Sequence, residues 1–166
     1  MKKQNLIKLL REMLRDSKRS DREIAKDIGV SQPTVSRTRA LLRKRGYIKS
    51  YTVIPDFEKL GYQILAFTFS KMKTYPPNEE IEKITKLAKE WIINYPNVIF
   101  AADGEGLGSD VIMISFHKDY ARYSDFMRNY AMSWGKVVDH FNSFLVSLGS
   151  GFKLKPLDLK YLADDI

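Results

Sequence analysis

The feature that most restricts the fold of this chain is a pair of helix-start signals within its first fifty residues. Ser20 precedes Glu23 at the spacing of a capping box, in which each side chain binds a backbone amide left free at the helix start. Gly29 supplies a left-handed residue that can end this short helix. Ser31 is a good cap for the next helix, and Pro33 fits its first turn. The pattern predicts two short helices joined by a tight turn.

The spacing of apolar residues predicts a further helix before these two and a core shared by all three. The expected buried residues are Leu6, Leu9, Leu10, Met13 and Leu14 in the first helix, Ile24, Ala25 and Ile28 in the second, and Val35, Leu41 and Leu42 in the third. Gly46 ends the last helix. Three helices in this order, with a glycine turn between the last two, form a helix-turn-helix.

The positive charge of the chain lies almost entirely in this part. Residues 1–50 hold fifteen Lys or Arg against five Asp or Glu, so their net charge is +10, whereas residues 51–166 carry −2. A basic segment joined to a near-neutral one indicates a module that binds a polyanion. A plain three-helix bundle with a polar exterior is the alternative, and it would explain the apolar spacing but not the charge.

In a helix-turn-helix the last helix enters the major groove of DNA, and its first turn meets the base edges. The side chains expected to contact DNA are Ser20, Arg22, Ser31, Gln32, Thr34, Ser36, Arg37, Arg39, Arg43 and Lys44. Gln32, Thr34 and Ser36 can donate to and accept from bases, and Arg37 can reach a guanine or a phosphate. The later cations, with Arg45, are expected to neutralise the phosphate backbone.

The remainder of the chain predicts a sheet with helices. Residues 47–54 are rich in β-branched and aromatic side chains and predict a strand or wing, and residues 56–61 predict one helical turn closed by glycine. Further strands are expected at 64–70, 98–102, 111–116 and 137–148, with helices from Asn78 and over 120–134. The helix from Asn78 should bury Ile81, Ile84, Leu87, Ala88, Trp91 and Ile92. The order βαββαβ is the ferredoxin-like split unit.

The run from Ile24 through GVSQPTVSRTRALLRKRGYIKSYTVIPDFEKLGY resembles the Lrp/AsnC family, the leucine-responsive and feast/famine transcription regulators. The positions that carry the resemblance are Ser31, Thr34, Val35, Leu42, Gly46, Ile48, Tyr51, Leu60 and Gly61. One departure is Thr38-Arg39, where the family has a basic and then an apolar residue. It leaves open which of Arg37 and Arg39 faces the bases.

The resemblance implies an α+β fold and a division of the chain into parts. We expect a winged helix-turn-helix over residues 1–55, a hinge at 56–62, and a ferredoxin-like (RAM/ACT-like) effector-sensing and dimerising domain at 63–149. Residues 150–166 would be an extension that covers a sheet edge or caps a neighbouring subunit. The implied partners are double-stranded DNA and further copies of the chain, in a dimer or higher oligomer.

The resemblance also implies a small-molecule effector, often an amino acid, at the glycine-rich loop between two strands. The candidates carried over to this loop are Gly106, Gly108, Ser109 and Asp110, although the family's Gly-x-x-Asp spacing is off by one here. Without a Gly-Lys-Ser/Thr ending or a following helix, the loop is a poor P-loop and a better hairpin turn. The alternatives are a ligand different from the family's and no ligand at all.

Other function classes find less support in the sequence. Zero cysteines exclude disulfides and cysteine-based zinc sites, and no apolar run approaches the roughly 20 residues of a membrane helix. His117 and His140 are expected to be structural or surface residues, and no catalytic residue, metal site or cofactor is predicted. The alternatives are a sirohaem-decarboxylase-like enzyme on the same fold and a ligand-sensing module that acts through protein contacts. The default location is the cytoplasm.

Overall fold

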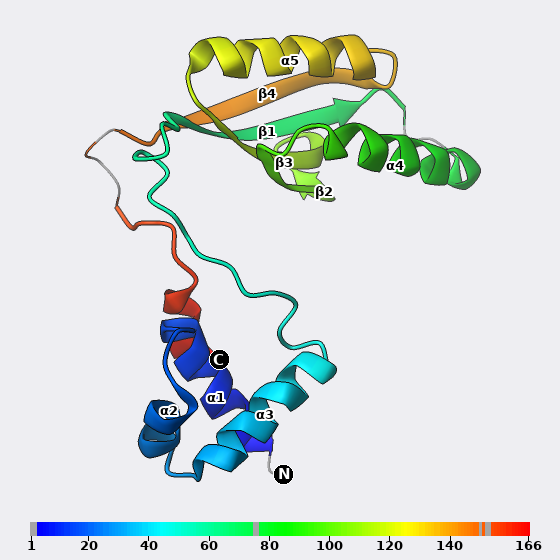
Figure 1. Ribbon diagram of the computed structural model, residues 1–166. Coiled ribbons are helices and arrows are strands. Elements are labelled where there is room, and N and C mark those ends of the chain that lie inside the picture. The colour runs from blue at the N-terminus through cyan, green and yellow to red at the C-terminus, as the bar shows by residue number, and fades with distance from the viewer. Residues whose placement is uncertain (1–2, 75–76, 150, 152–153) are drawn as a thin grey trace. The chain divides into compact units, whose positions relative to one another are not determined.

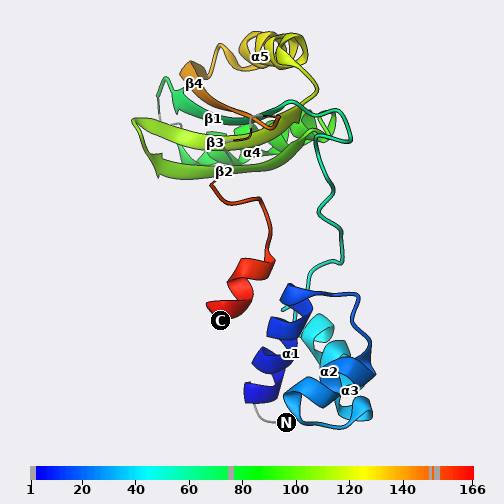
Figure 2. The same cartoon turned by 90° about the vertical axis from the view of Figure 1, so that its left-hand side faces the viewer.

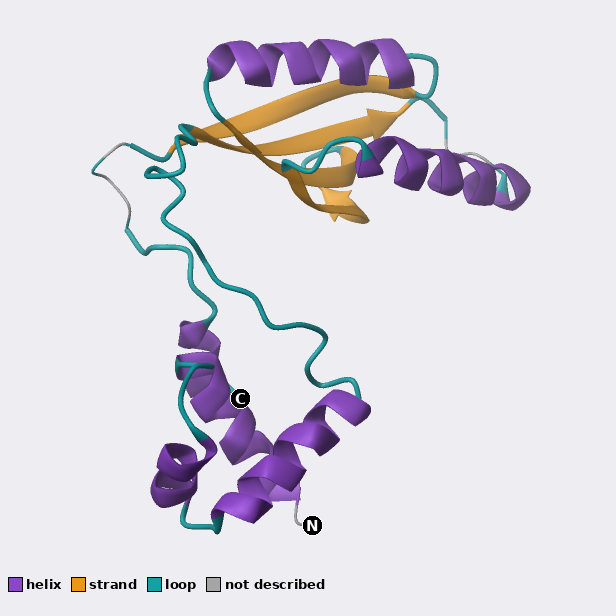
Figure 3. Cartoon of the chain, in the orientation of Figure 1, coloured by secondary structure: helices purple, strands orange, loops and turns teal. Residues whose placement is uncertain are grey.

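The computed structural model describes residues 3–74, 77–149, 151 and 154–166. The chain divides into two compact units (Figure 1), the first made of Met1–Ile54 with Lys153–Ile166 and the second of Pro55–Phe152. Helices make up the ordered elements of the first unit, and all strands of the described chain lie in the second (Figure 3). None of the helices in the described ranges is both long and apolar enough to cross a bilayer.

The first unit contains α1 (Lys3–Arg15), α2 (Asp21–Ile28), α3 (Gln32–Lys44) and the short 3-10 helix η1 (Lys160–Asp164). The predicted capping box at the start of α2 is confirmed, because the Glu23 amide donates to Ser20 Oγ at 3.3 Å and the Ser20 amide donates to Glu23 Oε2 at 2.8 Å. Gly29 ends α2 with a φ of 70°, in the left-handed region that glycine favours.

The start of α3 agrees with the sequence, and so does the core except for Leu14, which is half-buried outside it. The Thr34 amide donates to Ser31 Oγ at 3.4 Å, and Pro33 lies in the first turn. The buried core consists of Leu6, Leu9, Met13, Ile24, Ala25, Val35 and Leu42, with Leu10, Ile28 and Leu41 partly buried against it. The three helices therefore form the predicted helix-turn-helix.

The prediction of a strand or wing over residues 47–54 is wrong for this chain. The segment forms neither a helix nor a strand, and Tyr47, Tyr51, Val53 and Ile54 are exposed. A strand needs a second backbone to pair with, and none of the described residues pairs with this one. The β-branched and aromatic composition thus indicated a strand but could not supply a partner.

The second unit begins with the predicted turn over residues 56–61, which closes at Gly61 with a φ of 80°. The ring of Phe57 in this turn stacks on Phe116 with centroids 4.1 Å apart. The elements that follow are β1 (Ile64–Met72), α4 (Asn78–Ile93), β2 (Val98–Gly106), β3 (Ser109–His117), α5 (Tyr120–Trp134) and β4 (Val138–Ser147). The predicted order βαββαβ is confirmed.

The four strands form one sheet in the order β2-β3-β1-β4, with all neighbours antiparallel (Figure 2). The Tyr130 hydroxyl on α5 donates to Ser70 Oγ at 2.8 Å, which places the even-numbered side chains of β1 on the face toward α5. The core on this side consists of Met113, Phe126, Met127, Tyr130 and Val138.

The opposite face of the sheet is apolar and partly exposed. Phe67 of β1 is paired with Ile114 of β3 and Phe144 of β4, so the three side chains share this face. Phe144 is 68% exposed. Since isolated proteins rarely leave large contiguous apolar areas in water, this face is a candidate protein interface.

Helix α4 is covered less well than its sequence predicts. Ile81, Ile84, Ala88, Trp91 and Ile92 are half-buried rather than buried. Leu87, expected in the core, is 56% exposed, so its predicted burial is wrong. The apolar side of α4 faces a cavity instead of a closed core.

Candidate nucleic-acid interface

The third helix presents one buried side and one charged side. Val35, Thr38 and Leu42 face the core, and the Thr38 hydroxyl donates to the Thr34 carbonyl at 2.6 Å. The candidate DNA-contacting side chains that are exposed on α3 or at its start are Ser31, Gln32, Ser36, Arg37, Arg43 and Lys44, and Arg45 is exposed just after the helix. The helix-turn-helix core thus holds α3 in place while its cations face away from the protein.

Arg37 and Arg39 have different surroundings. Arg39 is half-buried, and its Nε and Nη2 lie 2.9 and 2.8 Å from Asp21 Oδ1 at the start of α2. It also donates to the Arg19 carbonyl at 3.4 Å. Arg37 is exposed and forms no ion pair within the described part of the chain. Arg39 therefore joins α3 to α2, which leaves Arg37 the better placed of the two to reach a base.

Three of the hydroxyl groups predicted to contact DNA already form hydrogen bonds at the N-termini of helices. Ser20 caps α2, and Ser31 Oγ lies 2.8 Å from Thr34 Oγ1 at the start of α3. Arg22 is exposed in the first turn of α2. The amide ends of both helices carry partial positive charge that favours an anion such as phosphate.

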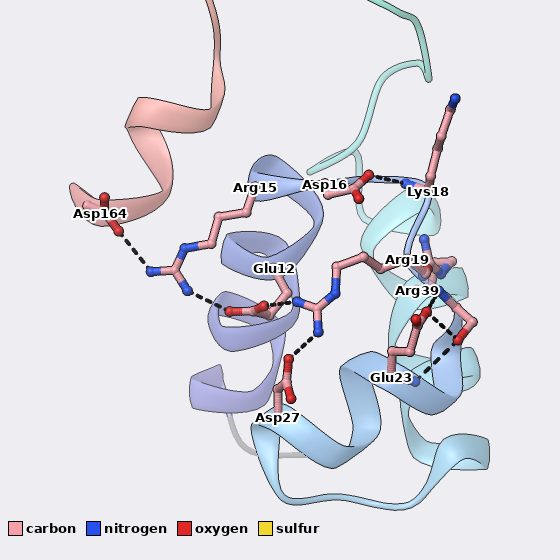
Figure 4. A network of polar contacts seen from close by, with 10 residues as sticks. Glu12, Arg15, Asp16, Lys18, Arg19, Glu23, Asp27, Arg39 and Asp164 are labelled. Atoms are coloured by element: carbon pink, nitrogen blue, oxygen red, sulfur yellow. Dashed lines mark hydrogen bonds and ion pairs between the residues drawn. The ribbon is translucent and has the colours of Figure 1, made fainter.

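Several basic residues of this unit are used internally, as Figure 4 shows. Arg15 lies 2.7 Å from Glu12 and 2.8 Å from Asp164, and the hydrogen bond to Asp164 is the main cause that raises the Arg15 pKa. Arg19 binds both Glu12 and Asp27, and the hydrogen bond to Asp27 raises its pKa. Arg15 and Arg19 are therefore engaged within the unit, whereas Arg37, Arg43, Lys44 and Arg45 on and after α3 are exposed.

Sequence reasoning missed two contacts near this surface. The roles of Arg19 and Arg39 as internal partners were not expected, and only the acidic residues on α1 and α2 could have hinted at them. Arg43 was expected near phosphate, and its guanidinium also lies 6.0 Å from the ring centroid of Tyr51. That distance is at the limit of a cation–π contact.

The four effector candidates lie together at the β2–β3 hairpin. Leu107 and Gly108 form a two-residue turn with φ values of 52° and 68°, positive at both positions as in the common hairpin turns. Gly106 precedes this turn, and Ser109 after it is buried. The predicted hairpin is confirmed.

Asp110 joins two strands. Its Oδ1 accepts from Lys71 Nζ at 2.7 Å and its Oδ2 accepts from the Met72 amide at 2.9 Å, both on β1. The hydrogen bond from Lys71, followed by that from Met72, lowers the pKa of Asp110. Both carboxylate oxygens thus already have partners within the unit.

A cavity of about 1010 Å³ lies beside this hairpin, between α4, α5 and the sheet. Its walls include the aromatic side chains Trp91, Tyr130 and Trp134 and the apolar Met113 and Val138, and Asp110 lies at its lining as well. Ligand pockets of this size are usually apolar with a few polar groups. Of the four candidates carried over from the family, only Asp110 lines it.

One of the two histidines is buried and the other lies on the surface, as expected for structural or surface residues. His117 is buried, its Nε2 lies 2.8 Å from Ser115 Oγ, and burial lowers its pKa. His140 is exposed beside Asp139, at 3.0 Å. Within the residues that the structure describes, no three His, Cys, Asp or Glu side chains gather as a metal site would require.

Known proteins share these features. Residues 7–43 match the AsnC-type helix-turn-helix domain. The HTH-type transcriptional regulator FL11 of Pyrococcus furiosus is 33% identical over 92 residues, 55% of this chain and 56% of FL11, so the chain spans about half the length of that relative. An uncharacterized HTH-type transcriptional regulator of Pyrococcus horikoshii is 28% identical over 149 residues, 90% of this chain and 95% of the relative.

The fold has solved counterparts. A transcriptional regulator of Neisseria meningitidis, solved as a complex with L-Met, superposes with a TM-score of 0.75 at 18% identity, over 98% of this chain and 99% of that one. This likeness shows that the two proteins share a fold made of a helix-turn-helix and a ferredoxin-like unit. The match over residues 7–43 agrees with the resemblance to the Lrp/AsnC family that the residues from Ile24 to Tyr62 carry.

Proposed function

We propose that this protein is a sequence-specific DNA-binding transcriptional regulator. The observation that carries the proposal is the exposed cationic side of α3, opposite a closed three-helix core. Its first turn presents Gln32, Ser36 and Arg37 for base edges, and the later cations suit phosphates. The names of the P. furiosus and P. horikoshii relatives support the same function. The proposal implies a cytoplasmic protein that is not an enzyme.

The open face of the sheet supports association of at least two copies. Phe67, Ile114 and Phe144 place a continuous apolar surface there, and two such faces are complementary to one another. A dimer would carry two α3 helices to successive major grooves, about 34 Å apart, on a pseudo-palindromic site. The first unit would then bind DNA while the second dimerises and senses an effector.

We further propose a small-molecule effector for the second unit. The N. meningitidis protein was solved with L-Met, and the cavity beside the hairpin offers a mainly apolar space of sufficient size. Trp91 and Tyr130 in its wall suit an apolar or aromatic group. Isothermal titration calorimetry with a panel of amino acids would test this, with Trp91→Ala expected to weaken the interaction. Equal binding heats for the wild type and the variant would show that the effector does not bind in this cavity.

The main experiment is selection of bound fragments from random DNA, followed by fluorescence anisotropy on the recovered site. If six to ten phosphates are neutralised, affinity should fall by about a thousandfold or more between 50 and 200 mM salt. Arg37→Ala should weaken binding to the selected site more than to random DNA. Lys83→Ala, at an exposed position of α4, is the matched control and should change neither.

Two outcomes would contradict the proposal. Binding that does not depend on salt would show that the cations of α3 meet no phosphate. An absorbance band of haem type in the purified protein, with turnover of a haem-like substrate, would favour the decarboxylase alternative instead. Equal loss on both DNAs in Arg37→Ala would assign that residue to phosphate rather than to a base.

A further inference from the structure

The C-terminal residues pack on the first helix of the chain. η1 lies against α1, and Ala163 in η1 has no exposed surface. Next to it, Arg15 Nη2 of α1 donates to Asp164 Oδ1 at 2.8 Å (Figure 4). A buried alanine allows the two backbones to approach closely, and the neighbouring ion pair fixes their position. The contact joins residues 149 positions apart in the sequence.

The residues just before this contact also interact with one another. The Lys160 amide donates to Asp158 Oδ1 at 2.9 Å, and Lys160 Nζ lies 2.9 Å from Asp158 Oδ2. The ammonium of Lys155 lies 3.9 Å from the ring centroid of Tyr161. These contacts shape the turn that leads into η1 and so direct Ala163 toward α1.

Helix α1 has a second face suited to receive η1. Ile7, Arg11 and Leu14 recur at helical spacing beside the row that enters the three-helix core, and Arg15 borders them. All three are half-buried, and Arg11 Nε is shielded from solvent with no hydrogen-bond partner among the described residues. Because Arg15 holds Asp164, this second face is the one that lies next to η1.

A series of alternating charges continues from the contact into the helix-turn-helix. Asp164 binds Arg15, Arg15 binds Glu12 on α1, and Arg19 binds both Glu12 and Asp27 on α2 (Figure 4). Exposed ion pairs are individually weak and are screened by salt. The buried contact therefore supplies most of the hold, and the charges set where η1 lies along α1.

The two segments that join the units leave the sheet side by side. Ile64 at the start of β1 is paired with Ser147 at the end of β4, and the Leu148 amide donates to the Gln63 carbonyl at 2.8 Å. One of these segments continues from α3, and the other leads to η1 on α1. The first unit is thus held by two covalent connections to neighbouring strands.

We infer that residues 154–166 are a docking segment that binds the second face of α1 and so completes the first unit. The docked segment gives this unit a second connection to the sheet, the second tie, besides the chain that follows α3. The effect on DNA binding rests on the proposed function, whereas the docking itself does not. Docking should protect the amides of α1 from exchange and keep α2 and α3 in the arrangement that DNA requires.

Hydrogen exchange on the full chain tests the docking. Ala163→Asp places a charge at a fully buried site and should raise exchange of the α1 amides about tenfold or more, while β1 and β3 stay unchanged. Leu154→Asp, the same change at an exposed residue of this segment, should have no effect. Asp164→Arg, with Asp165→Arg as its control, gives a milder version that keeps Ala163 in place.

The possible results distinguish the docking itself, its effect on DNA binding, and the proposed function. Unchanged α1 exchange in both Ala163→Asp and Asp164→Arg would overturn the docking. Faster exchange with an undiminished affinity for the selected DNA would overturn its role in binding, for which we expect a loss of several-fold. Absence of any DNA binding by the wild type would refute the proposed function and leave the exchange result intact. Protection that falls on dilution would assign the docked segment to a second copy.

A longer connection tests the second tie. Inserting six Gly and Ser residues after Gly151 should leave α1 exchange as it is, because the segment can still dock. If the tie limits how the first unit is held, the affinity for the full palindromic site should fall about threefold or more, with the affinity for a half-site unchanged. Equal affinities for the full site before and after insertion would show that the tie has no such role.

Discussion

Side chains in the core of the first unit, such as Leu9, Ile24 and Leu42, have no exposed surface, whereas aromatic side chains of the second remain open to solvent. Phe100 and Phe144 are 49% and 68% exposed, and α4 borders a cavity. The three-helix core of the first unit is therefore closed by residues of the chain alone, although Tyr47, Tyr51 and Val53, which follow it, are exposed. The second leaves exposed apolar surface that suits the proposed second copy and the proposed effector, since patches of this kind mark binding surfaces.

The largest expected effect is on the closed core. Leu42→Ala should lower the free energy of unfolding of the first unit by about 2–5 kcal/mol, because it removes buried methyl groups and leaves a void. Both tryptophans, Trp91 and Trp134, lie in the second unit. In a urea titration, the far-UV circular dichroism transition should shift while the tryptophan fluorescence transition stays in place.

Leu154→Ala, at an exposed position, serves as the control and should shift neither signal. If circular dichroism and fluorescence moved together in Leu42→Ala, the two units would unfold as one and the contrast between them would disappear.

The next effect concerns the open sheet face. Phe144→Asp should weaken association of two copies about tenfold to hundredfold, or roughly 1.4–2.7 kcal/mol, because it places a charge in an apolar interface. Sedimentation velocity over a dilution series measures this. Met132→Asp, at an 84% exposed position of α5, is the control and should leave association unchanged. A dimer that tolerates Phe144→Asp would have to use another surface.

A smaller effect depends on pH and on the second unit alone. Burial lowers the pKa of His117 from its ordinary 6.5, so the folded unit keeps this ring neutral. As pH falls below 6.5, the unfolded chain takes up a proton that the folded chain does not, and the folded state loses stability. The loss is at most about 1.4 kcal/mol per pH unit.

Fluorescence-detected unfolding between pH 7.5 and 5.5 measures the slope, and His117→Gln should flatten it. The first unit has no histidine, so its circular dichroism transition should change less over this range. A slope that persists in His117→Gln would assign the dependence to other groups.

The smallest effect concerns a helix cap. Ser20→Ala should lower the stability of the first unit by about 1 kcal/mol, because the Glu23 amide loses its acceptor at the start of α2. Differential circular dichroism in urea can resolve such a change. Ser17→Ala, at an exposed residue of the preceding turn, is the matched control. Equal stabilities for Ser20→Ala and Ser17→Ala would show that the capping box contributes nothing measurable.

Local signals in the sequence were sufficient for much of the fold. Ser20 and Ser31 fix helix starts through contacts three residues away, and the alternation of apolar spacing along the second unit gives its βαββαβ order. The exposed cations of α3 also follow from helical spacing. The assignment of particular side chains to DNA remains a prediction.

Contacts between distant residues could not be found in this way. The Arg39–Asp21 ion pair joins residues 18 positions apart, and nothing near Arg39 in the sequence reveals that Asp21 lies there. A strand or wing was predicted at residues 47–54, but a strand also depends on a pairing backbone elsewhere. The docking of Ala163 on α1 depends on the path of the chain through the whole second unit.

The position of η1 has a consequence for how the protein is made. A ribosome releases α1, α2 and α3 first, but the piece that covers the second face of α1 emerges only after the entire sheet has been translated. Until then a nascent chain would expose that side of α1 to chaperones or to other polypeptides.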